Sequence, residues 1–148
     1  MKDHKIKIFL AEDDDDDRDF FNAALESIES DVELITANNG EQVMNFFKMK
    51  KPLPDFVFLD INMPKADGIE CLRYIKKLYP SSELPVIMLS TASSEKVISL
   101  SHQNGASIYI EKPSQFKHLI TFINYCINDL KNAPPDAEFV LNRRLKNL

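Results

Sequence analysis

The sequence is poor in cysteine, glycine and long apolar runs, and each shortage argues against a class of protein. Its 148 residues include two cysteines, three glycines and no tryptophan. Cys71 and Cys126 lie far apart with no CxxC or Cys/His spacing, which favours free thiols in a reducing cytoplasm over a disulfide framework or a zinc site. No apolar stretch approaches the roughly 18 residues that a membrane helix needs. We therefore expect a soluble cytoplasmic protein with no membrane segment.

Basic residues are also too few for nucleic acid to be the main partner. The chain has 18 lysines and arginines against 23 acidic residues, and a phosphate backbone needs a basic face. The acidity is local, because residues 1–33 carry twelve acidic and four basic side chains. Six acids in a row, Glu12 to Asp17, either repel one another or gather around a cation. For Asp14 to Asp17 we expect a solvated turn that caps the first helix.

Short apolar runs alternate with helical patterns along most of the chain. Several runs are apolar at consecutive positions, as strands buried on both faces of a parallel sheet must be. The five predicted strands are Ile6–Ala11, Val32–Ala37, Phe56–Leu59, Val86–Leu89 and Ile108–Ile110. Between and after them apolar residues recur every three or four positions, and the last such stripe runs from Phe116 to Leu130. This alternation predicts an α/β fold with a doubly wound five-stranded parallel sheet and five flanking helices.

Polar side chains follow four of the predicted strands. Glu12 and Asp13 follow the first strand, Asp60 the third, Ser90 the fourth and Lys112 the fifth. Ligands of such folds lie at the carboxyl ends of the strands, so these side chains are expected to share one rim. The set suits phosphoryl chemistry, because a carboxylate can attack phosphorus and form an acyl phosphate. Mg²⁺, held by carboxylate oxygens, and a lysine can neutralise the phosphoryl charge.

Four motifs within about residues 5–130 resemble the receiver domain of two-component response regulators. They are Phe9–Asp14, Leu59–Pro64 with Asp67-Gly68, Leu84–Ser90 and Gly105–Pro113. Asp60 precedes Ser90 by thirty residues, and Ser90 precedes Lys112 by twenty-two, which is the family's usual spacing. The resemblance implies a flavodoxin-like sheet with the strand order 2-1-3-4-5.

The resemblance also implies the phosphoacceptor and the metal ligands. Asp60 corresponds to the phosphorylated residue. Asp13 and Glu12 correspond to side chains that hold Mg²⁺, with Asp60 itself and the backbone carbonyl of Asn62 as further ligands.

A second group of residues corresponds to the family's switch. Ser90 matches the switch hydroxyl by its spacing, although Thr91 is its neighbour, and Lys112 matches the phosphate partner. Tyr109 matches an aromatic side chain that changes rotamer when Ser90 moves, while plain packing remains the alternative for it. The family pattern further implies a cis Lys112–Pro113 bond.

We expect one receiver domain over residues 1–131 and a tail over residues 132–148. Seventeen residues after Lys131 are too few for an output domain, so we expect a stand-alone receiver that signals through protein contacts. Its implied donor is a sensor histidine kinase or a histidine phosphotransfer protein, and its implied reader is a downstream protein target. A second copy of the chain is another candidate partner. Such a protein is a phosphoacceptor with slow self-catalysed dephosphorylation rather than an enzyme.

Two other functions stay open at the level of sequence. A Mg²⁺-dependent aspartyl phosphohydrolase usually needs a second acid two residues after its nucleophile, where this chain has Asn62. A phosphorylation-independent interaction module would need only the fold, and the retained acids, hydroxyl and lysine argue against it.

The tail has an apolar pattern of its own. Ala133-Pro134-Pro135 should end the last main helix. Beyond it, apolar residues recur at helical spacing: Ala137, Val140, Leu141, Leu145 and Leu148. A short amphipathic helix is predicted, too short to be stable alone. We expect it to pack beside Tyr125 and Phe122, to exchange onto a second subunit or partner, or to fray.

Overall fold

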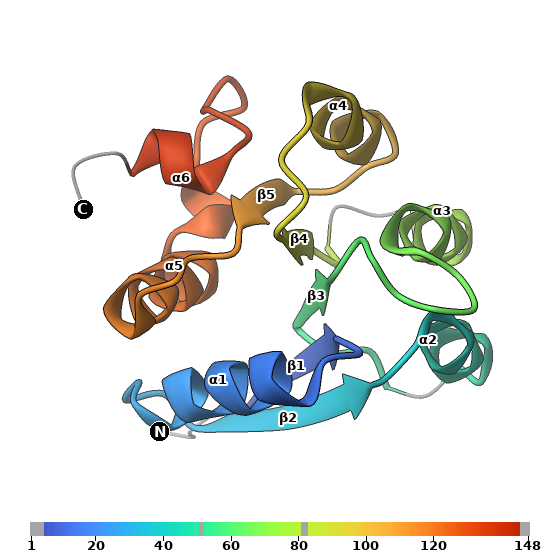
Figure 1. Ribbon diagram of the computed structural model, residues 1–148, viewed down its shortest axis with the longest axis horizontal. Coiled ribbons are helices and arrows are strands. Elements are labelled where there is room, and N and C mark those ends of the chain that lie inside the picture. The colour runs from blue at the N-terminus through green and yellow to red at the C-terminus, as the bar shows by residue number, and fades with distance from the viewer. Residues whose placement is uncertain (1–4, 51, 81–82, 146–148) are drawn as a thin grey trace.

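The computed structural model describes residues 5–50, 52–80 and 83–145, which form a parallel sheet between two layers of helices (Figure 1). The strands are β1 (Ile6–Ala11), β2 (Val32–Ala37), β3 (Phe56–Leu59), β4 (Val86–Ser90) and β5 (Ile108–Glu111). They pair in the order β2-β1-β3-β4-β5, and every pair is parallel. The predicted fold class and strand order are therefore confirmed. The strands β1, β2 and β3 have the predicted bounds, whereas β4 and β5 each extend one residue further.

Helices cover both faces of the sheet (Figure 1). One layer holds α1 (Asp15–Glu26) and α5 (Phe116–Asn128). The opposite layer holds α2 (Gly40–Lys48), α3 (Gly68–Leu78) and α4 (Glu95–Gln103). A 3₁₀ turn, η1 (Leu130–Asn132), follows α5, so the apolar stripe that was predicted to run to Leu130 leaves the α-helix at Asn128. Among the described residues, no helix combines the length and apolar character that crossing a membrane requires.

The continuous apolar runs of the central strands follow from burial on both faces. In β1, Phe9 packs toward α2 and contacts the rings of Phe46 and Phe47, whereas Leu10 belongs to the core cluster beneath α1 and α5. All four residues of β3 are buried in the same alternating way. The sheet is thus held by two apolar cores, one on each face, and the strand ends have a rigid base.

The loop after β3 is held close to helix α3 by a glycine. A Cβ atom at Gly68 would lie 2.2 Å from the backbone oxygen of Asp60, so only glycine allows this approach. The Gly68 N–H donates to the carbonyl of Ile61 at 2.8 Å. Asp67 and Glu70 form a capping box that begins α3. These contacts fix the backbone that carries Asp60.

The tail lies beside β5 and includes α6 (Leu141–Arg144), which is a single helical turn (Figure 1). Val140 forms an isolated parallel bridge with Tyr109, and the Tyr109 N–H donates to the carbonyl of Phe139 at 3.1 Å. The helical part of the tail is therefore shorter than its apolar spacing predicts, because residues 133–139 form turns and bends and Val140 bridges β5 before α6 begins. Leu148 lies outside the described residues.

The tail contacts both α5 and the edge of β5. Arg144 donates to the Tyr125 hydroxyl at 2.6 Å, so one contact with α5 is present. Leu141 of the tail is buried in the same apolar cluster as Phe122, and Tyr125 and Leu145 pack against that cluster. The tail also covers the edge of β5, whose backbone groups need partners.

The cis Lys112–Pro113 bond that the family pattern implied is a wrong prediction. The peptide bonds of the described residues are all trans, this one included. The trans isomer is favoured for an X–Pro bond by about 0.5–1 kcal/mol.

Candidate functional site

The predicted side chains meet at the carboxyl edge of the sheet. Glu12 and Asp13 follow β1, and the Asp60 N–H, just after β3, donates to the carbonyl of Ala11 at 3.1 Å. The Lys112 N–H, just after β5, donates to the carbonyl of Ser90 at 2.9 Å. These two bonds continue the sheet past the last residues of the strands. They hold the polar residues of the four strand ends in one row.

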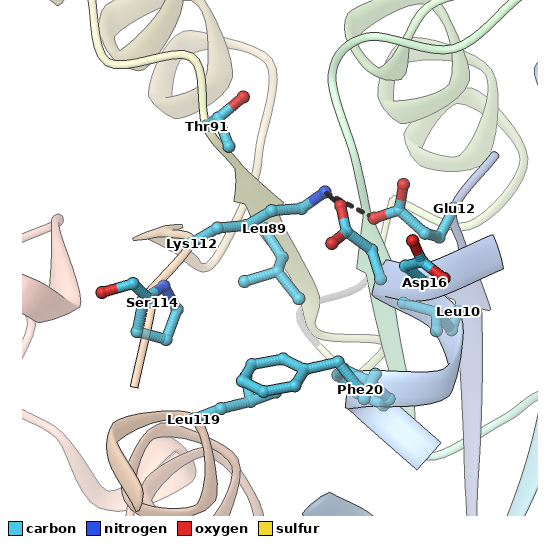
Figure 2. Close-up of a pocket in the computed structure, with 12 residues that line it drawn as sticks. Leu10, Glu12, Asp16, Phe20, Leu89, Thr91, Lys112, Ser114 and Leu119 are labelled. Atoms are coloured by element: carbon cyan, nitrogen blue, oxygen red, sulfur yellow. Dashed lines mark hydrogen bonds and ion pairs between the residues drawn. The ribbon is translucent and has the colours of Figure 1, made fainter. Parts of the chain in front are cut away.

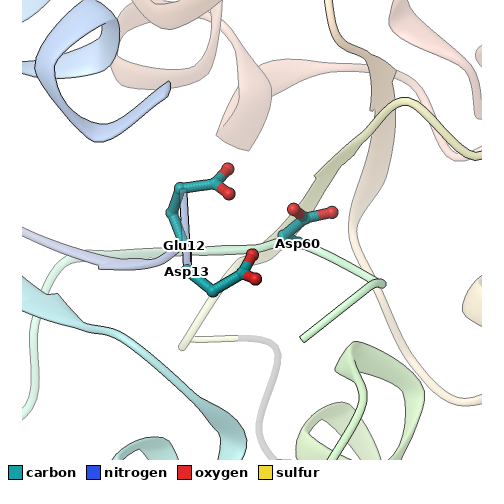
Figure 3. Close-up of side chains that lie close together, drawn as sticks. All are labelled: Glu12, Asp13 and Asp60. Carbon is teal, nitrogen blue, oxygen red and sulfur yellow. The ribbon is translucent and has the colours of Figure 1, made fainter. Parts of the chain in front are cut away.

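Three of these residues form a compact carboxylate cluster (Figure 3). Oxygen atoms of Glu12, Asp13 and Asp60 all lie within 4.8 Å of one another. Glu12 and Asp60 are buried, whereas Asp13 is exposed. Three carboxylates this close repel one another unless a positive charge lies between or beside them. Their hard oxygen donors fit Mg²⁺ or a similar divalent cation.

Asn62 lies two residues after Asp60 in the same loop. Its backbone N–H is 3.4 Å from Asp60 Oδ1, and its side chain is exposed. The predicted ligand in this residue, the backbone carbonyl, therefore belongs to the loop that carries the phosphoacceptor candidate.

Lys112 extends its ammonium group into the carboxylates (Figure 2). Lys112 Nζ lies 2.6 Å from Glu12 Oε1, 2.8 Å from Asp17 Oδ2 and 3.2 Å from Asp60 Oδ2. Its side chain is 15% exposed. The three ammonium protons thus have three carboxylate partners.

The electrostatics of the site follow from burial and from this contact. Burial, together with the negative charge of Asp60, raises the pKa of Glu12 to about 7, although the hydrogen bond from Lys112 works to lower it. Burial by itself would lower the pKa of Lys112, but hydrogen bonds to Asp17 and Glu12 raise it above its ordinary value. Lys112 is therefore a permanent positive charge next to Asp60.

Ser90 and Tyr109 lie together behind the cluster. Both are fully buried, and Ser90 Oγ accepts a hydrogen bond from the Ala92 N–H at 3.2 Å. The Tyr109 hydroxyl donates to the carbonyl of Ala92 at 2.6 Å. Burial raises the pKa of Tyr109 to about 12, while a hydrogen bond with Ser90 works to lower it. The competing hydroxyl, Thr91, is exposed. One backbone segment therefore connects Ser90 with Tyr109.

Sequence reasoning missed Asp17. It was expected to be a solvated cap with its neighbours, yet its carboxylate is one of the three partners of Lys112. Asp17 is the third residue of α1, whose N-cap is Asp14, so its first-turn position is equally that of a helix-capping acid. The spacing of the acidic run therefore does not single out Asp17 from its neighbours.

A cavity of about 420 Å³ opens beside Lys112 (Figure 2). Its apolar wall includes Phe20, Leu89 and Leu119, and its polar side includes Glu12 and Lys112. The cavity opens the Lys112 side chain to solvent, and Asp60 and Asp13 are not among the residues that line it.

The arrangement offers what phosphoryl transfer to a carboxylate requires. The Asp60 carboxylate is held by backbone contacts and is of the kind that can attack phosphorus, and Lys112 is a cation beside it. The adjacent carboxylates can hold a divalent cation.

Comparisons with known proteins agree with this geometry. A family model described as the response regulator receiver domain matches residues 8–124. The chain is 37% identical over 113 residues to the probable C4-dicarboxylate response regulator DctR of Bacillus subtilis, a match that covers 76% of this chain and 48% of DctR. It thus spans about half the length of that relative. It is 30% identical over 121 residues to the response regulator Rcp1 of Synechocystis sp., covering 78% of this chain and 82% of Rcp1.

Solved structures give the same result. The crystal structure of the phosphorylated cyanobacterial phytochrome response regulator RcpA has a TM-score of 0.78 at 29% identity, over 88% of this chain and 98% of RcpA. The Mn²⁺-bound form of Rcp1 has a TM-score of 0.74 at 27% identity, over 87% of this chain and 97% of that structure.

Proposed function

The chain belongs to the response regulator receiver domain family, and we propose that it accepts a phosphoryl group on Asp60 from a phosphohistidine donor and signals through protein contacts. The observation that carries the proposal is the position of the Asp60 carboxylate, which belongs to the carboxylate cluster and also contacts the Lys112 ammonium. General phosphoacceptor signalling fits the family. The identity of Asp60 as acceptor, and the roles of its neighbours, are the proposal.

The transfer step is a displacement at phosphorus. An Asp60 oxygen forms the new P–O bond and the P–N bond to the donor histidine breaks; the imidazole keeps the electron pair of that bond and leaves as a neutral ring because its other nitrogen already carries a proton. Lys112 pairs with a phosphoryl oxygen, and Ser90 donates a hydrogen bond to another. The acyl phosphate retains the charge of the phosphoryl group, so these donors stay in use after transfer.

The carboxylate cluster supports a metal ion in this proposal. Glu12, Asp13 and Asp60, with the backbone carbonyl of Asn62, would hold Mg²⁺, and the mutual repulsion of three carboxylates within 4.8 Å favours a cation there. When bound, the ion supplies positive charge that neutralises the phosphoryl oxygens. The Mn²⁺ bound to Rcp1 supports the assignment of a divalent cation.

In this proposal, phosphorylation of Asp60 is transmitted by a rearrangement at Ser90 and Tyr109. A phosphoryl group on Asp60 draws Ser90 toward it, and Ser90 shares the Ala92 segment with the Tyr109 hydroxyl. A rearrangement of that segment reaches α4, β5 and α5 and the tail that packs on them, and a downstream protein would read this combined surface. The donor is a sensor histidine kinase or a histidine phosphotransfer protein, with no nucleic acid or membrane involved. The buried free thiols Cys71 and Cys126 support a cytoplasmic location.

The first experiment tests phosphorylation directly. The purified protein is incubated with Mg²⁺ and acetyl phosphate and examined by intact-mass spectrometry. We expect one phosphoryl adduct, which Asp60→Asn removes and chelation of Mg²⁺ prevents. Asp19→Asn is the matched control, because Asp19 is an exposed acid of α1 and its substitution removes the same charge. Labelling of the Asp60→Asn variant at the wild-type level would contradict the assignment.

The same experiment separates the two other functions. Steady turnover of p-nitrophenyl phosphate by the wild-type protein would favour an aspartyl phosphohydrolase. Failure of the wild-type protein to form any adduct, while another receiver is labelled in parallel, would favour a phosphorylation-independent module.

A further inference from the structure

We propose that Asp17 is a positioning residue that holds the Lys112 ammonium at the edge of the site, so that Lys112 stays in place when a cation and a phosphoryl group engage Glu12 and Asp60. The inference deepens the proposed function and rests on it. It gives a role to Asp17, an acid of the run from Glu12 to Asp17 that lies outside the carboxylate cluster.

Lys112 has three carboxylate partners of two kinds. Glu12 and Asp60 belong to the cluster, and their side chains are 3% and 7% exposed. Asp17 lies outside the cluster, and its side chain is 45% exposed, yet its oxygen is only 2.8 Å from Lys112 Nζ. Asp17 is therefore the one partner among these three that the cation and the phosphoryl group leave unengaged.

Helix α1 fixes the position of Asp17. The Asp17 N–H donates to the side chain of its N-cap residue, Asp14, at 2.8 Å. Arg18 Nη1 donates to the carbonyl of Glu12 at 2.7 Å, which ties the first turn of α1 to the end of β1. Phe21, one turn from Asp17, is buried against Phe58 of β3. A carboxylate on this rigid turn can restrain the ammonium at the end of a flexible four-carbon stem.

The need for such a restraint follows from charge. A divalent cation among Glu12, Asp13 and Asp60 repels the ammonium and takes up the oxygens that now accept from it. Without Asp17, the lysine side chain would lose its remaining protein partner and gain freedom. With Asp17, one proton of the ammonium stays bound while the other two face the phosphoryl group. Correct orientation of a catalytic cation before the reaction lowers the barrier.

The competing interpretation is that the negative charge of Asp17 only stabilises the N-terminus of α1. Asp16 provides the matched control for it, because it has the same charge in the same helical turn and lines the same cavity, yet makes no ion pair with any described residue. A helix-terminus effect or a general effect of negative charge would be shared by both residues. A positioning effect would belong to Asp17 alone.

The experiment compares Asp17→Asn, Asp16→Asn and Asp17→Glu in the full chain. The first readout is the rate of Asp60 phosphorylation by acetyl phosphate at saturating Mg²⁺. We expect Asp17→Asn to lower the rate on the order of tenfold through lost orientation. Asp16→Asn should change it by no more than about twofold, as an exposed and screened charge does. Asp17→Glu should restore much of the rate, because it returns a carboxylate to Lys112.

The second readout is Mg²⁺ binding alone, measured by isothermal titration calorimetry without a phosphoryl donor. Asp17→Asn should weaken Mg²⁺ binding more than Asp16→Asn does, because the unrestrained ammonium then meets the cation without its balancing charge. Equal rates and equal affinities in the two asparagine variants would overturn the inference. If the wild-type protein takes no phosphoryl group, the proposed function fails, and the calorimetric comparison still decides the role of Asp17.

Discussion

Buried polar side chains mark the site at the scale of single residues. Four polar or charged residues are buried among the described ones, and three of them are Glu12, Asp60 and Ser90. The fourth, Ser101, donates to the carbonyl of Val97 one turn earlier in its own helix. No buried side-chain nitrogen or oxygen of the described residues lacks a hydrogen-bond partner. Burial of charge costs free energy, so its concentration at the strand ends is the mark of a functional centre.

The two cysteines should be unreactive in the folded protein. Burial raises the pKa of Cys71 to about 12, helped by the charges of Asp67 and Glu70. Burial also raises the pKa of Cys126 to about 12. At pH 8 the thiolate fraction is then on the order of one in ten thousand, and the thiolate is the reactive form. We expect iodoacetamide to leave both thiols unmodified between pH 7 and 9, and to modify both in urea, as mass spectrometry would show.

The raised pKa values of the two thiols also predict how the free energy of unfolding changes at high pH. Unfolded thiols lose their protons near pH 9, whereas the folded thiols keep them until about pH 12. The free energy of unfolding should therefore fall as the pH rises above about 9. Rapid modification of the native protein at pH 8, at the rate of a free cysteine, would contradict both statements.

At the scale of elements, the tail completes the sheet at the edge of β5. The side-chain amide of Asn142 pairs with the backbone of Glu111 in the way that a neighbouring strand would. The Glu111 N–H donates to Asn142 Oδ1 at 2.8 Å, and Asn142 Nδ2 donates to the Glu111 carbonyl at 2.9 Å. Arg143 pairs with Glu95 of α4 at 2.7 Å, and Arg144 reaches Tyr125 of α5. The tail thus joins three elements and covers an edge that would otherwise be free to pair.

Asn142→Ala tests this pairing. Loss of the amide leaves two backbone groups of Glu111 without their partners, so the free energy of unfolding should fall by about 1–3 kcal/mol. Urea unfolding followed by circular dichroism would measure the change. Asn22→Ala is the control, because Asn22 is exposed on α1 and its substitution should not destabilise the protein. Equal stability of the two variants would show that the Asn142 amide adds nothing.

At the scale of the whole molecule, the fold places three carboxylates at one rim of a rigid sheet, so the proposed binding of a metal ion there would be linked to folding. A cation that binds only the folded chain stabilises it by an amount that grows with concentration, about 2.7 kcal/mol at one hundred times the Kd. We expect Mg²⁺ to raise the thermal unfolding midpoint of the wild-type protein, as differential scanning calorimetry would measure.

Asp13→Asn is the variant for this prediction. It removes one proposed ligand and one repelling charge, so it should raise the stability measured in EDTA and reduce the increment that Mg²⁺ adds. The Asp19→Asn variant should keep the wild-type increment. An unchanged midpoint of the wild-type protein across the Mg²⁺ titration would contradict the metal assignment.

The sequence by itself determined the sheet and the position of the site. Apolar residues at consecutive positions require strands that are buried on both faces, and the alternation with helices requires parallel strands. Parallel strands end at one edge, so Glu12, Asp60 and Lys112 could be placed together before any contact was known. The resemblance supplied the strand order, which the structure and the comparisons confirm. The individual roles of these residues stay predictions.

Only the tertiary structure decided the contact of Asp17 with Lys112 and the course of the tail. These two residues are 95 positions apart, and the spacing of charges on one helix does not say which distant charge it will meet. The tail has an apolar pattern at helical spacing, yet residues 133–139 form turns and bends, and Val140 is extended where it bridges Tyr109 of β5. Local pattern fixes which face of an element is buried, whereas the partner of that face depends on how separate elements pack.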